Sequence, residues 1–174
     1  MIMIHITDKQ IDKAIAKIDK MDEAQFGKFF DSFSKSQPEL FDYILHYSDA
    51  LHNDEARDEF IFIMSVIWEC YRSLKLKLAE VTVKEINSME KTQMKEWEKL
   101  NTLKAGKEED AFIKKFITQP ALWAFMTETA FEDPEKPQNS NFSHDDDIAI
   151  LYSSTKMMCG LLDKQVAKAS EKAE

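Results

Sequence analysis

The first candidate for chemistry is a carboxylate that directly follows the most apolar run of the chain. Residues 60–68 are apolar except for Ser65, Glu69 comes next, and Arg72 lies three residues further on. A carboxylate buried on every side has a raised pKa and suits acid–base work. Alternatively, Glu69 and Arg72 form a partly exposed ion pair where a helix leaves the core. We favour the ion pair.

Aromatic side chains are the candidate lining of a pocket beside this carboxylate. Trp68 and Tyr71 flank Glu69, and Trp123 lies in a later apolar segment. With Glu69 and Arg72, these residues are the predicted ligand-binding set, because cavities between helices are lined mainly by apolar and aromatic side chains. A dry, fully packed core is the alternative arrangement.

One helix face has the spacing of a metal site, but we do not predict that it binds a metal. Asp42, His46 and Asp49 have the spacing i, i+4 and i+7, which could chelate a divalent cation. Their face lies opposite the apolar face of the same segment, so we expect it to point into solvent. Di-metal helical bundles instead use Glu-x-x-His motifs that face the core, and the chain has none. We therefore expect no metal and no cofactor, and we assign no catalytic residue.

The elements that must position these residues are helices. Apolar residues recur at spacings of three and four. A long helix is expected from about residue 55 to 80. The next helix, which follows the start signal at Thr82, is expected to end before Gly106. The fold class is therefore all-α, with about eight helices in a compact bundle and one domain over residues 1–174. Helix-start signals occur at Thr7, Asp22, Ser36, Thr82, Pro120 and Ser143.

Segments in the first half of the sequence are similar to segments in the second half. The start QPELFDYI is similar to QPALWAFM, and TDKQI is similar to TVKEI. The pattern predicts two duplicated four-helix units, residues 7–81 and 82–170, related by pseudo-twofold symmetry. Chance similarity between phenylalanine-rich helix pairs is the alternative. The matching segments are residues 37–44 with 119–126, 7–11 with 82–86, and 60–78 with 148–166.

Composition limits the partners. The net charge is −9, and two of the 23 basic residues are arginine, so a nucleic-acid partner is not expected. Residues 60–68 fall short of the ~20 apolar residues of a membrane span, so no membrane partner is expected. Cys70 and Cys159 lie in apolar helical patterns, which predicts two buried free thiols. No basic region precedes the apolar start, which argues against a signal peptide and favours a cytoplasmic protein.

Two function classes remain. The first is a non-catalytic helical module that acts through a protein partner or self-association. It is favoured by the apolar segment 1–6 and by acidic helix starts at 54–59 and 144–147, which suit a basic protein. The second is a small-ligand-binding or enzymatic bundle with a pocket near Glu69. A buried, unpaired Glu69 favours the second class, whereas a packed core with Glu69 in solvent favours the first. We expect the first class.

Overall fold

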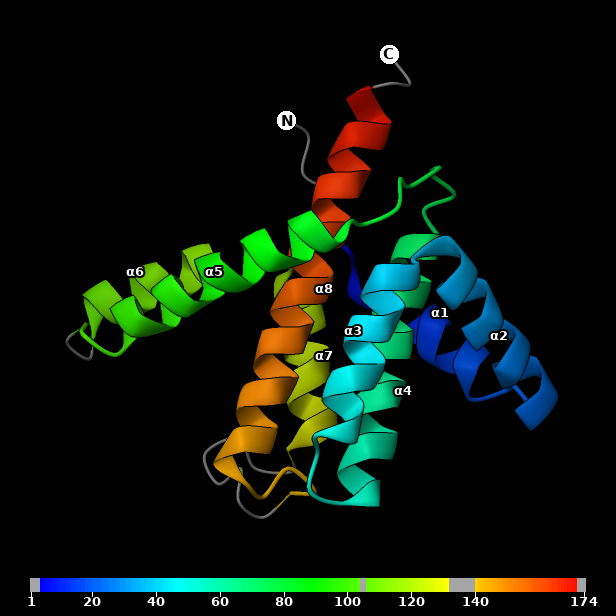
Figure 1. Ribbon diagram of the computed structural model, residues 1–174, viewed down its shortest axis with the longest axis horizontal. Coiled ribbons are helices and arrows are strands. Elements are labelled where there is room, and N and C mark those ends of the chain that lie inside the picture. Colours follow the sequence, from blue (N-terminus) through cyan, green and yellow to red (C-terminus); the bar gives the residue numbers. More distant parts are fainter. Residues whose placement is uncertain (1–3, 104–105, 132–139, 172–174) are drawn as a thin grey trace.

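The chain forms only helices in the residues that the computed structural model describes, which are 4–103, 106–131 and 140–171 (Figure 1). Eight helices within these ranges confirm the all-α prediction. None of the helices in the same ranges combines the length and apolarity that crossing a bilayer requires. The helices are α1 (Asp8–Ile18), α2 (Glu23–Ser36), α3 (Pro38–Asp49), α4 (Asp54–Arg72), α5 (Val83–Leu100), α6 (Lys107–Phe116), α7 (Pro120–Ala130) and α8 (Asp145–Glu171).

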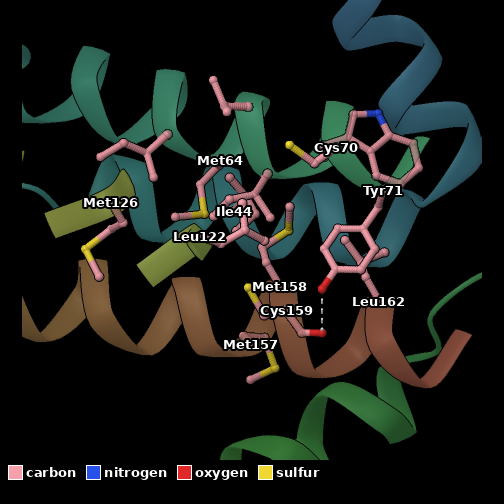
Figure 2. Close-up of a cluster of buried hydrophobic side chains, with 14 of the residues drawn as sticks. Ile44, Met64, Cys70, Tyr71, Leu122, Met126, Met157, Met158, Cys159 and Leu162 are labelled. Carbon is pink, nitrogen blue, oxygen red and sulfur yellow. Dashed lines mark hydrogen bonds between the residues drawn. The ribbon is translucent and has the colours of Figure 1, made fainter. Parts of the chain in front are cut away.

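Helices α4 and α8 pack against each other at the centre of the bundle. Helices α1, α3 and α7 pack on α4, and α3 and α5 pack on α8. Residues 63–71 of α4 and 154–159 of α8 are buried without interruption. The Tyr71 hydroxyl donates to the Cys159 carbonyl across this contact, at 3.3 Å (Figure 2). The prediction that the apolar run 60–68 belongs to a buried helix is confirmed.

Most helices begin where the sequence signals predict. At the start of α5, the Glu85 N–H donates to Thr82 Oγ1 at 3.2 Å and the Thr82 N–H donates to Glu85 Oε2 at 2.9 Å. The same reciprocal pair begins α2. Helix α8 differs, because it begins at Asp145 rather than directly after Ser143. Its first backbone hydrogen bond is accepted by the carbonyl of His144.

Two predicted helix ends are wrong. The helix expected over 55–80 ends at Arg72, and Lys75 adopts the left-handed conformation with φ 57°, which turns the chain out of the helix. Gly106 does not end α5, which stops at Leu100. Instead it precedes α6 with φ 119°, a conformation that glycine adopts without the steric penalty of a side chain.

The segment before α1 is fastened to the chain itself by a buried glutamine. Gln119 Oε1 accepts from the Ile6 N–H at 2.9 Å, and its Nε2 donates to the Ile4 carbonyl at 2.8 Å. Ile6 is buried and Ile4 packs on the core. Residues 1–3 lie outside the described residues. Ile4 and Ile6 therefore pack against their own chain, whereas His5 between them is exposed.

The segment before α5 is held in the same way. Gln37 Oε1 accepts from the Val81 N–H at 2.8 Å, and its Nε2 donates to the Ala79 carbonyl at 3.0 Å. Gln37 and Gln119 stand directly before α3 and α7, and both are almost fully buried. Each side chain thus pairs with backbone groups that no helix satisfies.

We predict that Gln37→Ala and Gln119→Ala each lower the free energy of unfolding by about 2–3 kcal/mol, because each leaves a buried backbone N–H unpaired. Gln119→Ala should cost more, since Gln119 Nε2 also donates to Asp163. Urea unfolding followed by circular dichroism measures both. The exposed control Lys91→Ala should stay within about 0.5 kcal/mol of the parent. A loss under about 1 kcal/mol for either glutamine variant would contradict the role of these bonds.

Candidate functional site

Glu69 is paired, as expected, but it is buried, so its expected position as a partly exposed residue is wrong. Its side chain is 7% exposed. Oε1 accepts from Lys17 Nζ at 2.8 Å, and Oε2 accepts from Arg72 at 2.6 and 2.8 Å. The expected ion pair with Arg72 exists, but Lys17 from α1 adds a second cation. With both oxygens engaged, Glu69 joins α1 to α4.

The predicted aromatic residues lie in separate clusters. Trp68 stacks on Phe33 with ring centroids 4.6 Å apart, whereas Trp123 lies 5.9 Å from Phe116. The Tyr71 hydroxyl points away from both and takes part in the α4–α8 contact. None of the five residues predicted to bind a ligand lines a hollow described below. Ligand binding by this set remains a prediction.

A groove, called here the α3–α5–α8 groove, has a volume of about 630 Å³. Helix α5 crosses α8 and leaves the bundle, so that its far half stands away from α3 (Figure 1). The groove lining has two carboxylates and neither lysine nor arginine. It consists of Tyr43, Tyr47, Ala50, His52, Glu90, Gln93, Met94, Trp97, Asp146, Ala149, Ile150 and Ser153.

Aromatic and sulfur-containing side chains give this groove its apolar surface. The rings of Tyr43 and Tyr47 lie 4.7 Å apart, and the Tyr47 hydroxyl donates to Glu90 at 3.5 Å. Burial, with Tyr47 and Glu90 nearby, raises the pKa of Tyr43, so its hydroxyl stays protonated. Met94 is 63% exposed and lies on the same wall as Trp97. An exposed methionine beside aromatic rings is typical of adaptable binding surfaces.

One end of the groove is closed by a histidine–aspartate pair. His52 Nδ1 lies 2.8 Å from Asp147 Oδ1, and the His52 ring stacks on His144 at 4.1 Å. The hydrogen bond to Asp147, with the charges of Asp147 and Asp146, raises the pKa of His52, although partial burial lowers it. The pair joins the α3–α4 connection to α8. Sequence reasoning missed it because 95 residues separate the two partners.

A second hollow, called here the α5–α8 pocket, has a volume of about 310 Å³. It lies between α5 and α8, next to the connection from α6 to α7. Unlike the groove, it contains both lysines and carboxylates. It is lined by Ile4, Met89, Thr92, Glu96, Lys115, Thr118, Lys156, Gly160, Asp163, Lys164 and Ala167.

Lys156 ties three helices together at the wall of this pocket. Its Nζ donates to the Phe116 carbonyl at 2.9 Å, lies 3.2 Å from Glu96 Oε2, and sits 3.5 Å from the centroid of the Phe116 ring. Burial lowers the pKa of Lys156, although Glu96 raises it. The ammonium group is therefore fully engaged by α5 and α6. Its role at this wall is to hold the helices rather than to react.

Asp163 has one engaged and one free oxygen at the pocket wall. Oδ1 accepts from the Tyr71 hydroxyl and from Gln119 Nε2, both at 2.7 Å. Oδ2 is buried and has no hydrogen-bond partner. Burial raises the pKa of Asp163, although hydrogen bonds from Tyr71, Gln119 and Thr118 and the nearby His5 lower it. Because Oδ2 has almost no accessible surface, the role of Asp163 that the structure shows is to hold Tyr71 and Gln119 through Oδ1.

The remaining sequence candidates lie outside both hollows. Asp42, His46 and Asp49 are all exposed on α3, which confirms the predicted direction of that face. Across the described residues, no three His, Cys, Asp or Glu side chains lie close enough to hold a metal ion. Cys70 and Cys159 are free and buried, as predicted, and burial raises the pKa of Cys70 to about 12.

We predict that stability depends on the protonation of His52. Because its pKa is raised in the folded chain, its stabilising effect is complete below the ordinary value of 6.5 and is lost as the pH rises through the raised value. The urea midpoint should therefore fall as the pH rises above 6.5. His52→Gln should flatten this change, and exposed His46→Gln should leave it intact. An unchanged pH profile for His52→Gln would refute the assignment.

Comparisons with protein-family models, with curated proteins and with solved structures found no match for this chain. Function must therefore be argued from the surfaces themselves. The groove offers an apolar, aromatic and acidic surface, and the pocket offers a small hollow of mixed charge. Their different chemistry favours different ligands.

Proposed function

We propose that this chain is a non-catalytic helical interaction module, and that its α3–α5–α8 groove binds a cationic amphipathic helix of a partner protein. The observation that carries the proposal is the groove lining, which combines tyrosine, tryptophan and methionine with two carboxylates and neither lysine nor arginine. Aromatic and methionine side chains supply much of the binding energy at protein interfaces. The one basic side chain of the lining, His52, is held by Asp147, so no lysine or arginine pairs with the lining carboxylates Glu90 and Asp146.

The groove has the right length for about two turns of a helix. Its α5 wall runs from Glu90 to Trp97, and its α8 wall runs from Asp146 to Ser153. Seven residues of helix span ~10 Å. Amphipathic helices bind grooves through apolar side chains at positions i, i+3, i+4 and i+7, which cover this length. The size therefore supports a helix as the occupant.

The surrounding charge supports a basic partner. The starts of α4 and α8 lie side by side, where the Asn53 amide donates to the Asn141 carbonyl at 3.0 Å (Figure 1). Both starts are acidic, and Asp146 belongs to the groove itself. Lysine or arginine side chains of a partner can pair with these carboxylates and stack on the tyrosine rings.

The proposal also places the module in the cytoplasm, with no catalytic role for Glu69. Two buried thiols that stay free are in keeping with a reducing compartment. Glu69 has a cation on each oxygen and lines no described hollow. No observation favours a small-ligand or enzymatic site beside it.

Duplication of a four-helix unit, residues 7–81 and 82–170, is part of the proposal. Two features support it. The threonine capping box of α1 recurs in α5, and the Gln-Pro start of α3 recurs in α7. Gln37 and Gln119 also bind backbone groups before α5 and α1 in matching ways. In the duplication, α5 corresponds to α1 and α3 corresponds to α7. Helix α1 packs on α7, whereas α5 and α3 line the groove. The groove would thus have arisen where the two units diverged.

The test is binding of a synthetic peptide of about 14 residues, close to four helical turns, with leucine on one face and lysine on the other. Fluorescence anisotropy measures its affinity for the full chain. A matched peptide with glutamate in place of lysine is the control. The lysine peptide should bind at least about tenfold more tightly, since its charge complements the groove. Equal affinity for the two peptides would contradict the proposal.

Charge reversal in the groove locates the binding site. Glu90→Lys should weaken binding of the lysine peptide about tenfold, because it places a cation among the groove carboxylates. Glu98→Lys makes the same change at an exposed position of α5 outside the groove. This control should weaken binding less than about twofold. Equal losses of affinity in the two variants would show that binding depends on the net charge of the protein rather than on the groove.

A further inference from the structure

One carboxylate of the α3–α5–α8 groove has no cation beside it. Glu90 is half-buried on α5, and its side chain has one hydrogen-bond partner in the part of the chain that the structure describes, the Tyr47 hydroxyl at a long 3.5 Å. No ion pair among the same residues includes Glu90. By contrast, Glu69, Glu85 and Glu96 each contact a lysine. The negative charge of Glu90 is therefore available to a partner.

Two tyrosine rings from α3 lie beside this carboxylate. Tyr43 and Tyr47 have ring centroids 4.7 Å apart, and both line the groove together with Glu90. Burial raises the pKa of each tyrosine, and the charge of Glu90 raises it further. One carboxylate thus acts on both hydroxyl groups. We call Glu90, Tyr43 and Tyr47 together the Glu90–tyrosine site.

The chemistry of this site distinguishes between the two basic side chains. A cation bound here must donate hydrogen bonds to a carboxylate and exchange part of its water for aromatic contacts. The guanidinium group of arginine is planar and weakly hydrated, stacks on aromatic rings, and presents a fork of N–H donors that matches a carboxylate. The ammonium group of lysine is a compact and strongly hydrated charge. The site therefore favours arginine over lysine.

The neighbouring surface of α5 determines what lies next to the arginine. Met94 follows Glu90 by one helical turn and also lines the groove, where its side chain is exposed. Residues one turn apart lie on the same face of a helix. A partner helix that runs along α5 can therefore place a cation at Glu90 and an apolar side chain on Met94.

We propose that the groove recognises an arginine of the partner helix, with its guanidinium group on Glu90 and against the tyrosine rings, and an apolar residue one turn away on Met94. This inference rests on the proposed function and deepens it. The partner is then selected by the position of an arginine, in addition to its overall positive charge.

An arginine scan of the leucine–lysine peptide, with the full chain as its receptor, tests the inference. Each lysine in turn is replaced by arginine, which keeps the length, the charge and the leucine face. In fluorescence anisotropy, arginine should tighten binding at least about fivefold at a position that borders the leucine face, where it reaches the Glu90–tyrosine site. At positions opposite the leucine face, which point into solvent, the change should stay below about twofold.

The scan separates failure of this inference from failure of the proposed function. If the parent peptide binds and the scan is flat, the arginine site is wrong while the proposed function stands. If neither the parent peptide nor any arginine peptide binds, both are wrong.

Variants of the protein assign the arginine preference to the site. The measured quantity is the affinity ratio of the best arginine peptide to the parent peptide, so a general loss of binding does not imitate the effect. Glu90→Gln removes the charge and should lower the ratio to less than about twofold. Tyr47→Leu removes a ring and should at least about halve it, whereas Tyr47→Phe keeps the ring and should retain it. An unchanged ratio in Glu90→Gln or Tyr47→Leu would overturn the assignment.

A matched control tests whether any glutamate of α5 has the same effect. Glu98 is exposed and lies outside the groove. Glu98→Gln makes the same chemical change as Glu90→Gln and should leave the ratio as it is in the parent protein. An equal fall of the ratio in both variants would show that the preference for arginine does not arise at Glu90.

Discussion

The structure depends on the burial of two helices against each other. Residues 63–71 of α4 and 154–159 of α8 are largely removed from water, so polar groups there need protein partners. The Tyr71 hydroxyl meets this need through the Cys159 carbonyl and Asp163. Asp163 in turn accepts from Gln119, which holds the segment before α1. One hydrogen-bonded network thus connects the central pair to α7 and to the start of the chain.

The sequence predicted those features that depend on local physics. Capping boxes, prolines in first turns and apolar residues at helical spacing each act within a few residues, and they located most helix starts and the buried run 60–68. For Glu69, the favoured interpretation, a partly exposed ion pair with Arg72, was right about the pair and wrong about the exposure. Its second partner could not be predicted, because Lys17 is 52 residues away and lies on another helix. The sequence could therefore suggest a buried carboxylate but not whether its charge was compensated.

The two hollows also could not be predicted, because each is formed by residues that are distant in the sequence. The groove takes residues from α3, α5 and α8, and the pocket combines Ile4 with residues up to Ala167. Asp163 had no local signal, because its environment is made by Tyr71 and Gln119 from other helices. The helix expected to continue to residue 80 ends at Arg72, and the chain then passes through Lys75 in a left-handed conformation. Tertiary contacts, rather than helix propensity, decide such ends.

Helix α5 is the wall that the groove and the pocket share, so the shape of one depends on that of the other. Gln93 Nε2 donates to the Ser153 carbonyl at 3.2 Å, and Glu85 accepts from Lys168 at 2.7 Å, which fixes α5 on α8. Burial opposes ionisation of Glu85, but the bonds from Lys168 and Thr82 lower its pKa to about 2, so this contact persists at ordinary pH. Because both hollows use α5 as a wall, any displacement of this helix at one hollow would also alter the other. Any such coupling must act equally in both directions.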